Sequence, residues 1–341
     1  MPAIQAPSKV LVTGANGFIA GWIIKDLLTH GFSVRGVIRA EGKGDALRTA
    51  LTENVEKLEF VVVPDITLPG AFDSALEGVD AIVHTASPVT VVCDHPDELI
   101  VPALQGTISI LRSACRPGSS VKRIIYVSSL AAVVDNSRPI PATFSEADWN
   151  ESDVAEVKEK AAAASGPAKY RTSKTLAERA AWDCFNEGKE KGSIGWDLVS
   201  LNPPWVFGPP LGARTLADLT TLMRTWYKIV VTEDGEIPAW SRTTWVDVRD
   251  FARATLAALV RPEAGGERFI IANASFLWKE WIPRARRLLG KPGTELPSAS
   301  ELVYEHFFDA TKSRKMLNMQ YRDMDESTTF IIEDFKKKGW C

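Results

Sequence analysis

The sequence predicts an α/β protein built on a Rossmann-type, doubly wound parallel sheet with a smaller C-terminal α/β substrate lobe. Over residues 1–200, short runs rich in Val and Ile alternate with amphipathic stretches, and a glycine-rich turn follows the first run. Alternation of strands with helices is typical of βαβ units, in which helices cover both faces of a parallel sheet. These two observations predict the fold class.

The predicted strands are apolar runs that few polar residues interrupt, as expected for strands buried on both faces. They are Lys9–Thr13, Ser33–Ile38, Leu58–Val63, Ala81–His84, Arg123–Val127 and Asp197–Leu201. Helical patterns lie between them, for example at Ala20–Thr29 and Thr172–Phe185. Consecutive strands are therefore expected to be joined by crossover helices.

The pattern changes after the last of these strands. Residues Asn202–Gly212 are rich in proline and glycine and predict an ordered loop. A return helix is predicted over Trp245–Val260 and a short strand over Arg268–Ala272. The last part of the chain predicts mixed elements that end in a Lys-rich helix.

The length of 341 residues exceeds the roughly 250–300 at which a single hydrophobic core stops growing. We therefore predict either one large domain with an added lobe or two domains. The dinucleotide-binding Rossmann domain takes residues 1–204 and a return segment at about 243–262. The substrate-binding lobe takes residues 205–242 and 263–341.

Composition argues against several functions. With 40 basic and 43 acidic residues the net charge is −3, and no long basic run is present, so we expect no nucleic-acid partner. The cysteines Cys93, Cys115, Cys184 and Cys341 form neither a C-x-x-C nor a Cys/His cluster, so we expect no metal site and no disulfide framework. No apolar stretch approaches the ~18 residues of a membrane span, and the expected location is the cytoplasm.

The glycine-rich turn is the first candidate site. Gly14 permits a tight strand-to-helix turn, Gly17 lets the backbone approach a pyrophosphate, and the small Ala20 lets the helix pack closely on the strand. A phosphate would then lie at a helix N-terminus, where free N–H groups and the helix dipole favour negative charge. The alternative is a tight turn without a ligand. The glycine-rich turn lies in the first βαβ unit, and this position favours dinucleotide binding.

The end of the second strand distinguishes the two nicotinamide cofactors. An NAD site has Asp or Glu there to bond the ribose 2′-hydroxyl. Here Arg39 ends the strand and Lys43 follows four residues later, which offers positive charge to a 2′-phosphate. Arg35 lies inside the strand and is the weaker candidate. Unless Arg39 and Lys43 are ordinary surface charges, the cofactor is NADPH.

Tyr170 and Lys174 are spaced i,i+4 at the start of a predicted helix, so they lie on one helix face. A tyrosine with its usual pKa of ~10 is a poor proton shuttle at neutral pH. We expect a nearby Lys⁺ to stabilise the phenolate and lower the pKa of Tyr170. Alone, this spacing is common and carries little weight.

Two serines, Ser128 and Ser129, follow the fifth predicted strand. In an open α/β sheet the ligand crevice lies outside the carboxyl ends of the strands, which is where these hydroxyls emerge. One of them is placed to hydrogen-bond a substrate carbonyl beside the tyrosine. The alternative role is to cap a turn or a helix.

At this point the chain resembles the extended short-chain dehydrogenase/reductases. The resemblance is carried by TGANGFIA (13–20), YVSSLAAV (126–133) and YRTSK (170–174). Supporting stretches are VVVPDIT (61–67), HTASP (84–88), LNPPWVFGPP (201–210), WVDVRDFARA (245–254) and DATKSRKML (309–317). Within the family the chain is most similar to the dihydroflavonol-reductase-like group, which includes fungal NADPH-dependent aldehyde and methylglyoxal reductases.

The resemblance implies roles for residues at matching positions. Ser129 is the expected catalytic serine, Tyr170 the proton donor, and Lys174 the residue that bonds the nicotinamide ribose and lowers the pKa of the tyrosine. The expected cofactor-binding residues are Gly14, Asn16, Gly17, Phe18, Ile19, Arg39, Lys43, Asp65, Ile66, Thr85, Ala86, Ser87, Lys174, Pro203 and Val206. Val134 and Trp205 are the expected substrate contacts.

The function implied is NADPH-dependent reduction of neutral aldehydes or ketones to alcohols. Val134 stands where flavonoid-reducing members of the family carry Asn, which argues against flavonoid substrates. Alternatives of the same fold are a nucleotide-sugar epimerase or dehydratase and a sterol dehydrogenase. An alternative of another class is a non-catalytic NADP-binding regulator. The expected partner is a small carbonyl compound, and the expected assembly is a monomer or homodimer.

Overall fold

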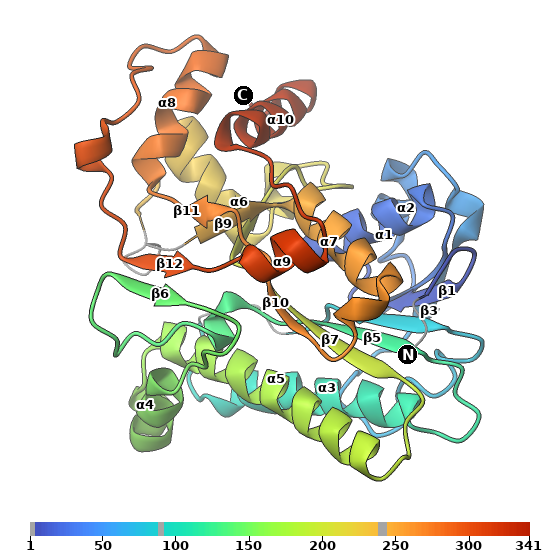
Figure 1. Cartoon of the computed structure of the whole chain (residues 1–341). Helices are drawn as coiled ribbons and strands as arrows, with labels where there is room; N and C mark the ends of the chain where they lie inside the picture. Colours follow the sequence, from blue (N-terminus) through green and yellow to red (C-terminus); the bar gives the residue numbers. More distant parts are fainter. Residues whose placement is uncertain (1–3, 88–91, 238–243) are drawn as a thin grey trace.

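The central element of the protein is a seven-stranded parallel sheet (Figure 1). The computed structural model describes residues 4–87, 92–237 and 244–341. The sheet order is β3-β2-β1-β4-β5-β7-β10. Its strands are β1 (Lys9–Val12), β2 (Ser33–Ile38), β3 (Leu58–Val62), β4 (Ala81–His84), β5 (Arg123–Val127), β7 (Asp197–Asn202) and β10 (Arg268–Ile270). The predicted Rossmann-type fold is confirmed.

The strand order reverses direction beside β1. From β1 the chain first moves outward to β2 and β3, and it then returns to place β4 on the other side of β1. Val10 accordingly pairs with Val34 of β2 and with Ala81 of β4. In open α/β sheets the ligand binds at this switch point, outside the carboxyl ends of the strands.

Helices cover both faces of the sheet, as the buried strands require. On one face, α1 (Phe18–Thr29) packs against α7 (Val248–Val260), with α2 (Asp45–Ala50) beside them; on the other, α3 (Asp97–Ala114) packs against α5 (Gly166–Glu190). Neighbouring residues of β1 point to opposite faces. Val10 and Val12 join the core under α1 and α7, whereas Leu11 joins the core under α3 and α5.

Two small sheets and a set of helices lie beside the main sheet, and they are built mostly from the C-terminal part of the chain (Figure 1). The three-stranded sheet contains β8 (Trp205–Phe207), β9 (Thr244–Asp247) and β11 (Ala274–Ser275), and the two-stranded sheet pairs β6 (Ala142–Phe144) with β12 (His306–Phe308). The remaining helices are α4 (Ser152–Lys160), α6 (Thr221–Trp226), α8 (Trp278–Leu289), α9 (Thr311–Met316) and α10 (Met324–Lys337).

Three expectations differ from the structure. Over the described residues 63–80, no helix connects β3 to β4, although we expected crossover helices between consecutive strands. The predicted loop Asn202–Gly212 contains strand β8, and the first residues of the predicted helix Trp245–Val260 belong to strand β9. The two strands pair with each other, with Trp205 opposite Trp245. Strands of three and four residues are too short to show a periodic pattern in the sequence. Their strand conformation depends on their pairing.

The domain division stays a prediction. One strand bears on it, because β10 extends the main sheet beside β7, although we assigned residues 263–341 to the substrate lobe. The predicted boundary between residues 242 and 243 lies outside the described residues.

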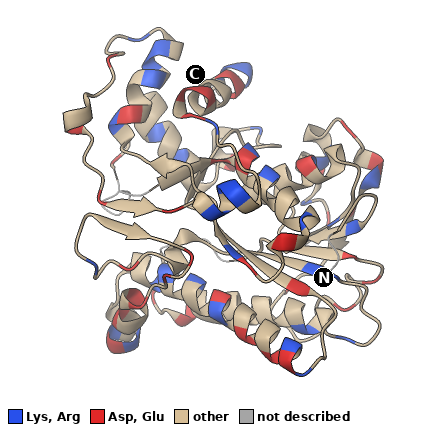
Figure 2. Cartoon of the chain, viewed as in Figure 1, with Lys and Arg blue, Asp and Glu red and all other residues tan. Residues whose placement is uncertain are grey.

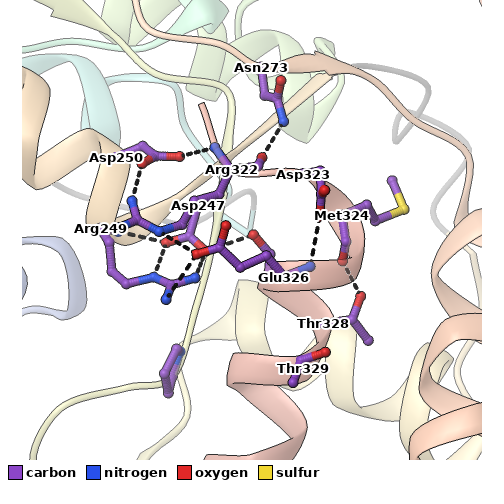
Figure 3. Close-up of polar contacts among 12 residues, drawn as sticks. Asp247, Arg249, Asp250, Asn273, Arg322, Asp323, Met324, Glu326, Thr328 and Thr329 are labelled. Carbon is purple, nitrogen blue, oxygen red and sulfur yellow. Dashed lines mark hydrogen bonds and ion pairs between the residues drawn. The ribbon is translucent and has the colours of Figure 1, made fainter. Parts of the chain in front are cut away.

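A polar network joins the C-terminal helix to the Rossmann unit (Figure 3). Asp247 is buried at the start of α7 and accepts hydrogen bonds from Arg249 Nε at 2.9 Å and from Ser327 Oγ of α10 at 2.7 Å. Arg322 pairs with the buried Asp250, and its backbone N–H donates to Asp250 Oδ2 at 2.8 Å. These contacts join α10 and the segment before it to the start of α7, which covers the sheet that carries the candidate site.

Charged residues of both signs are interspersed over the chain (Figure 2). In the part of the chain that the structure describes, no helix is both long and apolar enough to cross a membrane. Among those same residues, no His, Cys, Asp and Glu side chains gather in a group of three or more that could hold a metal ion.

A buried ion pair ties β5 to β7 and to the end of α7. Arg123 Nε donates to Asp197 Oδ1 at 2.7 Å, and both side chains are almost fully buried. Arg123 Nη1 also donates to the carbonyl oxygen of Ala258 at 2.7 Å. Because both charges are shielded from water, each depends on the other for its stability in the folded state.

Replacing Asp197 with Ala should therefore destabilise the protein strongly. The guanidinium of Arg123 stays buried without its counter-ion, and losing one partner of a buried pair costs about 3–5 kcal/mol of unfolding free energy. Urea unfolding measures the loss. The control is Glu187→Ala, which removes the exposed partner of Lys191 and should barely change stability. Equal effects of both changes would contradict the argument.

Candidate active site

The glycine-rich turn connects β1 to α1 at the switch point. Gly14 has a φ of +63°, a conformation that L-residues rarely adopt, and a Cβ there would lie 3.3 Å from the Cα of Ala86. Gly17 is the N-cap of α1, and no side chain caps that end of the helix. The first N–H groups of α1 thus face the turn without a side-chain acceptor, as a phosphate site requires.

The other residues of the turn lie beside this helix end. Asn16 is exposed, whereas Phe18 and Ile19 are half-buried and pack against the core under α1 and α7. Gly36 on β2 is a contributor that sequence reasoning missed. A Cβ on Gly36 would come within 2.8 Å of Ala15 Cβ and of the Phe60 ring, so only glycine lets β2 pass so close to the turn.

Thr13 holds the turn against the segment that follows β4. Its Oγ1 accepts hydrogen bonds from the backbone N–H groups of Thr85 and Ala86, each at 3.0 Å. With both lone pairs used, its hydroxyl proton donates to His84 Nδ1 at 2.9 Å, so His84 carries its own proton on Nε2. Burial lowers the pKa of His84 to about 3, which keeps the ring neutral.

The structure therefore brings the predicted cofactor residues Thr85, Ala86 and Ser87 directly beside the turn. Ser87 Oγ is buried and has no hydrogen-bond partner among the described residues. A buried hydroxyl without a partner is costly, and a bound ligand would satisfy it. Pro88, the last residue of the HTASP motif, lies outside the described residues.

Arg39 and Lys43 are both exposed, just beyond the carboxyl end of β2. Two hydrogen bonds from Thr67 lower the pKa of the Asp65 carboxyl, and the charge of Arg39 lowers it further, which places Arg39 near this expected cofactor-binding residue. Ile66, the next residue, packs closely against α3. A Cβ added to Gly106 of α3 would lie only 2.9 Å from Ile66 Cδ1.

Arg35, the weaker candidate for the 2′-phosphate, is engaged elsewhere. It donates to Glu59 Oε1 at 2.7 Å and to the carbonyl oxygens of Ala75 and Glu77, each at 2.8 Å. These hydrogen bonds join Arg35 of β2 to Glu59 of β3 and to the segment at residues 75–77. Arg39 and Lys43 therefore stay the candidates for the 2′-phosphate beyond the end of β2.

Ser129 follows β5 and begins a 3-10 turn at Leu130–Ala132. Its extended backbone makes it the N-cap, and its Oγ accepts a hydrogen bond from Ala131 N–H at 3.1 Å. The side chain is half-buried, and its hydroxyl proton remains available for another acceptor. The proposed capping role and the proposed catalytic role are thus compatible.

Tyr170 and Lys174 lie one turn apart near the start of α5, with Lys174 Nζ 5.9 Å from the centre of the Tyr170 ring. Burial lowers the pKa of Lys174 to about 8, against the charge of Glu178, which raises it. Burial also raises the pKa of Tyr170, and a hydrogen bond with Ser129 lowers it by less. The hydroxyls of Ser129 and Tyr170 are therefore neighbours.

We expected the pKa of Tyr170 to be lowered, but its net direction is the opposite. The pKa of Tyr170 lies above its usual value, because loss of water around the phenol outweighs its hydrogen bond with Ser129. Tyr170 is consequently protonated at neutral pH, which is the state that a proton donor needs.

Sequence reasoning missed Glu178 and Asn202, which adjoin the Ser–Tyr–Lys group. Glu178 is fully buried and accepts a hydrogen bond from Asn202 Nδ2 at 2.8 Å, and the same Nδ2 lies 3.1 Å from the carbonyl oxygen of Ser129. The signal that could have identified Glu178 is its spacing, four residues after Lys174 and thus on the same helix face.

The predicted contacts of the nicotinamide and of the substrate lie on the segments around Ser129. Pro203 and Val206 are buried after β7, and the Pro203 carbonyl accepts from Leu130 N–H at 2.8 Å. Val134 is half-buried beside the cluster of Leu130 and Val133. Trp205 is half-buried at the edge of an aromatic cluster that includes Trp278 and Phe276. The ring centres of these two residues lie 5.7 Å and 6.3 Å from that of Trp205.

These features fit a dinucleotide. The uncapped N-terminus of α1 suits a pyrophosphate, the exposed Arg39 and Lys43 suit a 2′-phosphate, and Ser87 Oγ is buried with no hydrogen-bond partner among the described residues. The fold and site thus define a nucleotide-binding α/β protein with a Ser–Tyr–Lys group at its switch point.

Comparison with known proteins identifies the family within this class of nucleotide-binding α/β proteins. The sequence model of the NAD dependent epimerase/dehydratase family matches residues 10–272. The chain is 35% identical to "Ketoreductase azaE" of Aspergillus niger, covering 95% of this chain and 98% of that protein. It is 31% identical to "NADPH-dependent methylglyoxal reductase GRE2" of Saccharomyces cerevisiae, covering 94% and 95%.

A solved structure gives the same picture. The crystal structure of yeast methylglyoxal/isovaleraldehyde reductase Gre2 complexed with NADPH matches 98% of this chain and 100% of its own, with a TM-score of 0.83 and 29% identity. The chain belongs to the NAD dependent epimerase/dehydratase family. The resemblance to the extended short-chain dehydrogenase/reductases is thereby confirmed.

Replacing Arg39 with Ala should weaken NADPH binding selectively. A hydrogen bond to a charged group contributes ~1.5–3 kcal/mol, which corresponds to a 10- to 150-fold change in affinity. NADH has no 2′-phosphate, so its affinity should hardly change. Fluorescence titration with both cofactors measures this.

The matched control for that experiment is Arg35→Ala, which removes a guanidinium that Glu59 and two carbonyl oxygens already hold. It should affect stability rather than cofactor choice. Equal losses of NADPH and NADH affinity in Arg39→Ala would show that Arg39 supports the fold instead.

Proposed function

We propose that the protein is an NADPH-dependent carbonyl reductase that converts neutral aldehydes or ketones to alcohols. The observation that carries this proposal is the placement of Ser129, Tyr170 and Lys174 together at the switch point of a dinucleotide-binding sheet. It is supported by the similarity to proteins named ketoreductase and NADPH-dependent methylglyoxal reductase.

When bound, NADPH supplies the hydride that reduces the carbonyl carbon. The chain binds and orients the reactants. Ser129 and Tyr170 hydrogen-bond the substrate oxygen, and Tyr170 donates its proton to that oxygen as negative charge develops. Lys174 is positioned for the ribose hydroxyls, and its ammonium stabilises the phenolate that Tyr170 leaves behind.

The substrate is neutral. The proposed wall formed by Val134 and Trp205 presents apolar and aromatic surface, and neither side chain carries a charge that could form an ion pair with a carboxylate or a phosphate. Trp205 lies where the three-stranded sheet meets the segment after Ser129, so it can shape the pocket from the lobe. The protein acts in the cytoplasm as a monomer or homodimer, and it needs no metal, nucleic acid or membrane partner.

The Tyr170→Phe variant tests the proton donor. The change keeps the ring and removes the proton, so turnover of an aldehyde with NADPH should fall by at least ~10²-fold, the lower range for general acid catalysis. NADPH affinity should stay nearly unchanged. The control is Tyr227→Phe, which removes a phenol hydroxyl that donates to the Trp340 carbonyl oxygen at 2.8 Å. If Tyr170→Phe keeps more than about a tenth of the turnover, Tyr170 is not the acid.

The Trp205→Ala variant tests the substrate wall. Removing the indole should enlarge the pocket and change the enantiomeric excess of the alcohol formed from a prochiral aryl ketone, with the melting temperature within a few degrees. Phe276→Leu is the control, because Phe276 packs on Trp205 but is fully buried in the aromatic cluster. Early unfolding of Trp205→Ala with unchanged enantiomeric excess would place Trp205 in the core.

A further inference from the structure

The carboxylate of Glu178 lies one helical turn beyond Lys174, and the mechanism above does not use it. The side chain is fully buried. Its Oε2 accepts hydrogen bonds from Ser128 Oγ at 2.6 Å and from Asn202 Nδ2 at 2.8 Å. Its Oε1 accepts from Ser200 Oγ at 2.8 Å and from Arg268 Nε at 2.7 Å.

These partners come from one helix and three neighbouring strands, and the carboxylate ties the helix to those strands. Glu178 is on α5, Ser128 follows β5, Ser200 and Asn202 are on β7, and Arg268 begins β10. Helix α5 also carries the proposed proton donor, and the end of β5 carries the proposed catalytic serine. One buried anion thus joins the elements that must keep these two groups in register.

Two short paths lead from the carboxylate to Ser129. Ser128 is its neighbour in the chain, and the Ser128 hydroxyl is held by Glu178. The amide of Asn202 donates both to Glu178 Oε2 and to the carbonyl oxygen of Ser129, at 2.8 and 3.1 Å. The backbone of Ser129 is therefore fixed from the preceding residue and at its own carbonyl.

Arg268 completes the network and neutralises the carboxylate. Its Nη1 donates to the carbonyl oxygens of Glu146 at 2.9 Å and Asp148 at 2.6 Å, and its guanidinium stacks on the Trp149 ring at 3.9 Å. Burial raises the pKa of Glu178, but Arg268 and the hydroxyl donors outweigh it, so the pKa is lowered and the group is ionised. A satisfied buried pair of this kind holds a defined geometry.

Several titratable groups surround Lys174. Tyr170 and Glu178 face it from α5, and the charge of Lys174 acts on His84 of β4. Tyr126 of β5 lies within reach of both Glu178 and Tyr170. His84 is neutral, and burial raises the pKa of both tyrosines. The ionised Glu178 opposes the effect of burial on Lys174.

We propose that Glu178 is a positioning residue, whose carboxylate holds Ser129 in register with Tyr170 through Ser128 and Asn202 and keeps Lys174 charged. The proposal rests on the roles of Ser129, Tyr170 and Lys174 in the proposed function. Its rival is a purely structural ion pair between Glu178 and Arg268, which would stabilise the fold without affecting the placement of Ser129.

A matched pair of variants separates the two. Ser128→Ala and Ser200→Ala each remove one buried hydroxyl that donates to Glu178, so their melting temperatures should fall by similar amounts. Only Ser128 adjoins Ser129. Ser200 Oγ also lies 3.3 Å from Asn202 Oδ1, but the shorter hydrogen bond of Asn202 Nδ2 with Glu178, at 2.8 Å, still orients the amide in Ser200→Ala.

We expect kcat of Ser128→Ala to fall at least about tenfold below that of Ser200→Ala, because misplacing a reacting group by ~1 Å can cost ~10²-fold in rate. NADPH affinity should match in the two variants. Crystal structures of both should show Ser129 displaced from Tyr170 in Ser128→Ala alone. Equal kcat and an unmoved Ser129 in both variants would overturn the proposal.

The Glu178→Gln variant tests the charge. Without the anion the pKa of Lys174, about 8 in the native protein, should fall further, so the loss of kcat at alkaline pH should begin at least about half a pH unit lower. Ser200→Ala keeps the anion and should keep the native pH profile. An unshifted profile in Glu178→Gln contradicts the role in charging Lys174.

The outcomes remain interpretable if one arm fails. Should Glu178→Gln not fold, because its amide N–H groups would face the donors of Arg268 and Asn202, the serine pair still decides the positioning role. A wild-type protein that reduces no aldehyde or ketone with NADPH would refute the proposed function. The crystallographic comparison of Ser128→Ala with Ser200→Ala would decide the role of Glu178 even then.

Discussion

The reversal of strand order beside β1 is the constraint on which the rest of the structure depends. Because β2 and β4 lie on opposite sides of β1, the segments after these strands diverge and leave a crevice at the carboxyl edge. The glycine-rich turn, the segment after His84 and the serines after β5 all begin at this edge. Their chemistry is brought together by the direction of parallel strands rather than by nearness in sequence.

Burial of charge is the second feature that the site depends on. Lys174, Glu178 and Arg268 are all buried, and each ion would be costly in the apolar core without partners. The carboxylate of Glu178 accepts hydrogen bonds from several donors, and Arg268 is held by carbonyl oxygens on its other side. The network is therefore stable only as a whole, which gives the groups above it a single geometry.

Much of the Rossmann unit could be predicted from the sequence, because buried strands and helices carry their own periodic signals. The predicted strands Lys9–Thr13 and Arg123–Val127 are observed at Lys9–Val12 and Arg123–Val127, and the turn at Gly14 lies where its spacing requires. Strand β8 could not be predicted, since it exists only through pairing with β9. Gly36 was missed for a similar reason: its need for glycine comes from Phe60 and Ala15, which are distant in sequence.

The candidate site shows the same division. The i,i+4 spacing of Tyr170 and Lys174 and the place of two serines after a strand indicated candidates, and the family resemblance assigned the roles, to Ser129 among the serines. The hydrogen bonds of Asn202 and Arg268 to Glu178 could not, because they join β7, β10 and α5 across gaps of 24 and 90 residues. The sequence motifs thus indicate the proposed reacting groups, whereas the hydrogen bonds that orient these groups become visible only in the folded structure.

The pKa values of the site favour proton donation over proton removal. Burial raises the pKa of Tyr170, so the phenol holds its proton until an acceptor of comparable basicity is placed beside it. A carbonyl oxygen that gains negative charge during reduction is such an acceptor, whereas a ground-state carbonyl is not. Lys174, with a pKa of about 8, is mostly charged at neutral pH and can stabilise the phenolate only after the proton has left. The electrostatic stabilisation therefore increases as the reaction proceeds, which is the condition for lowering the barrier rather than merely binding the substrate.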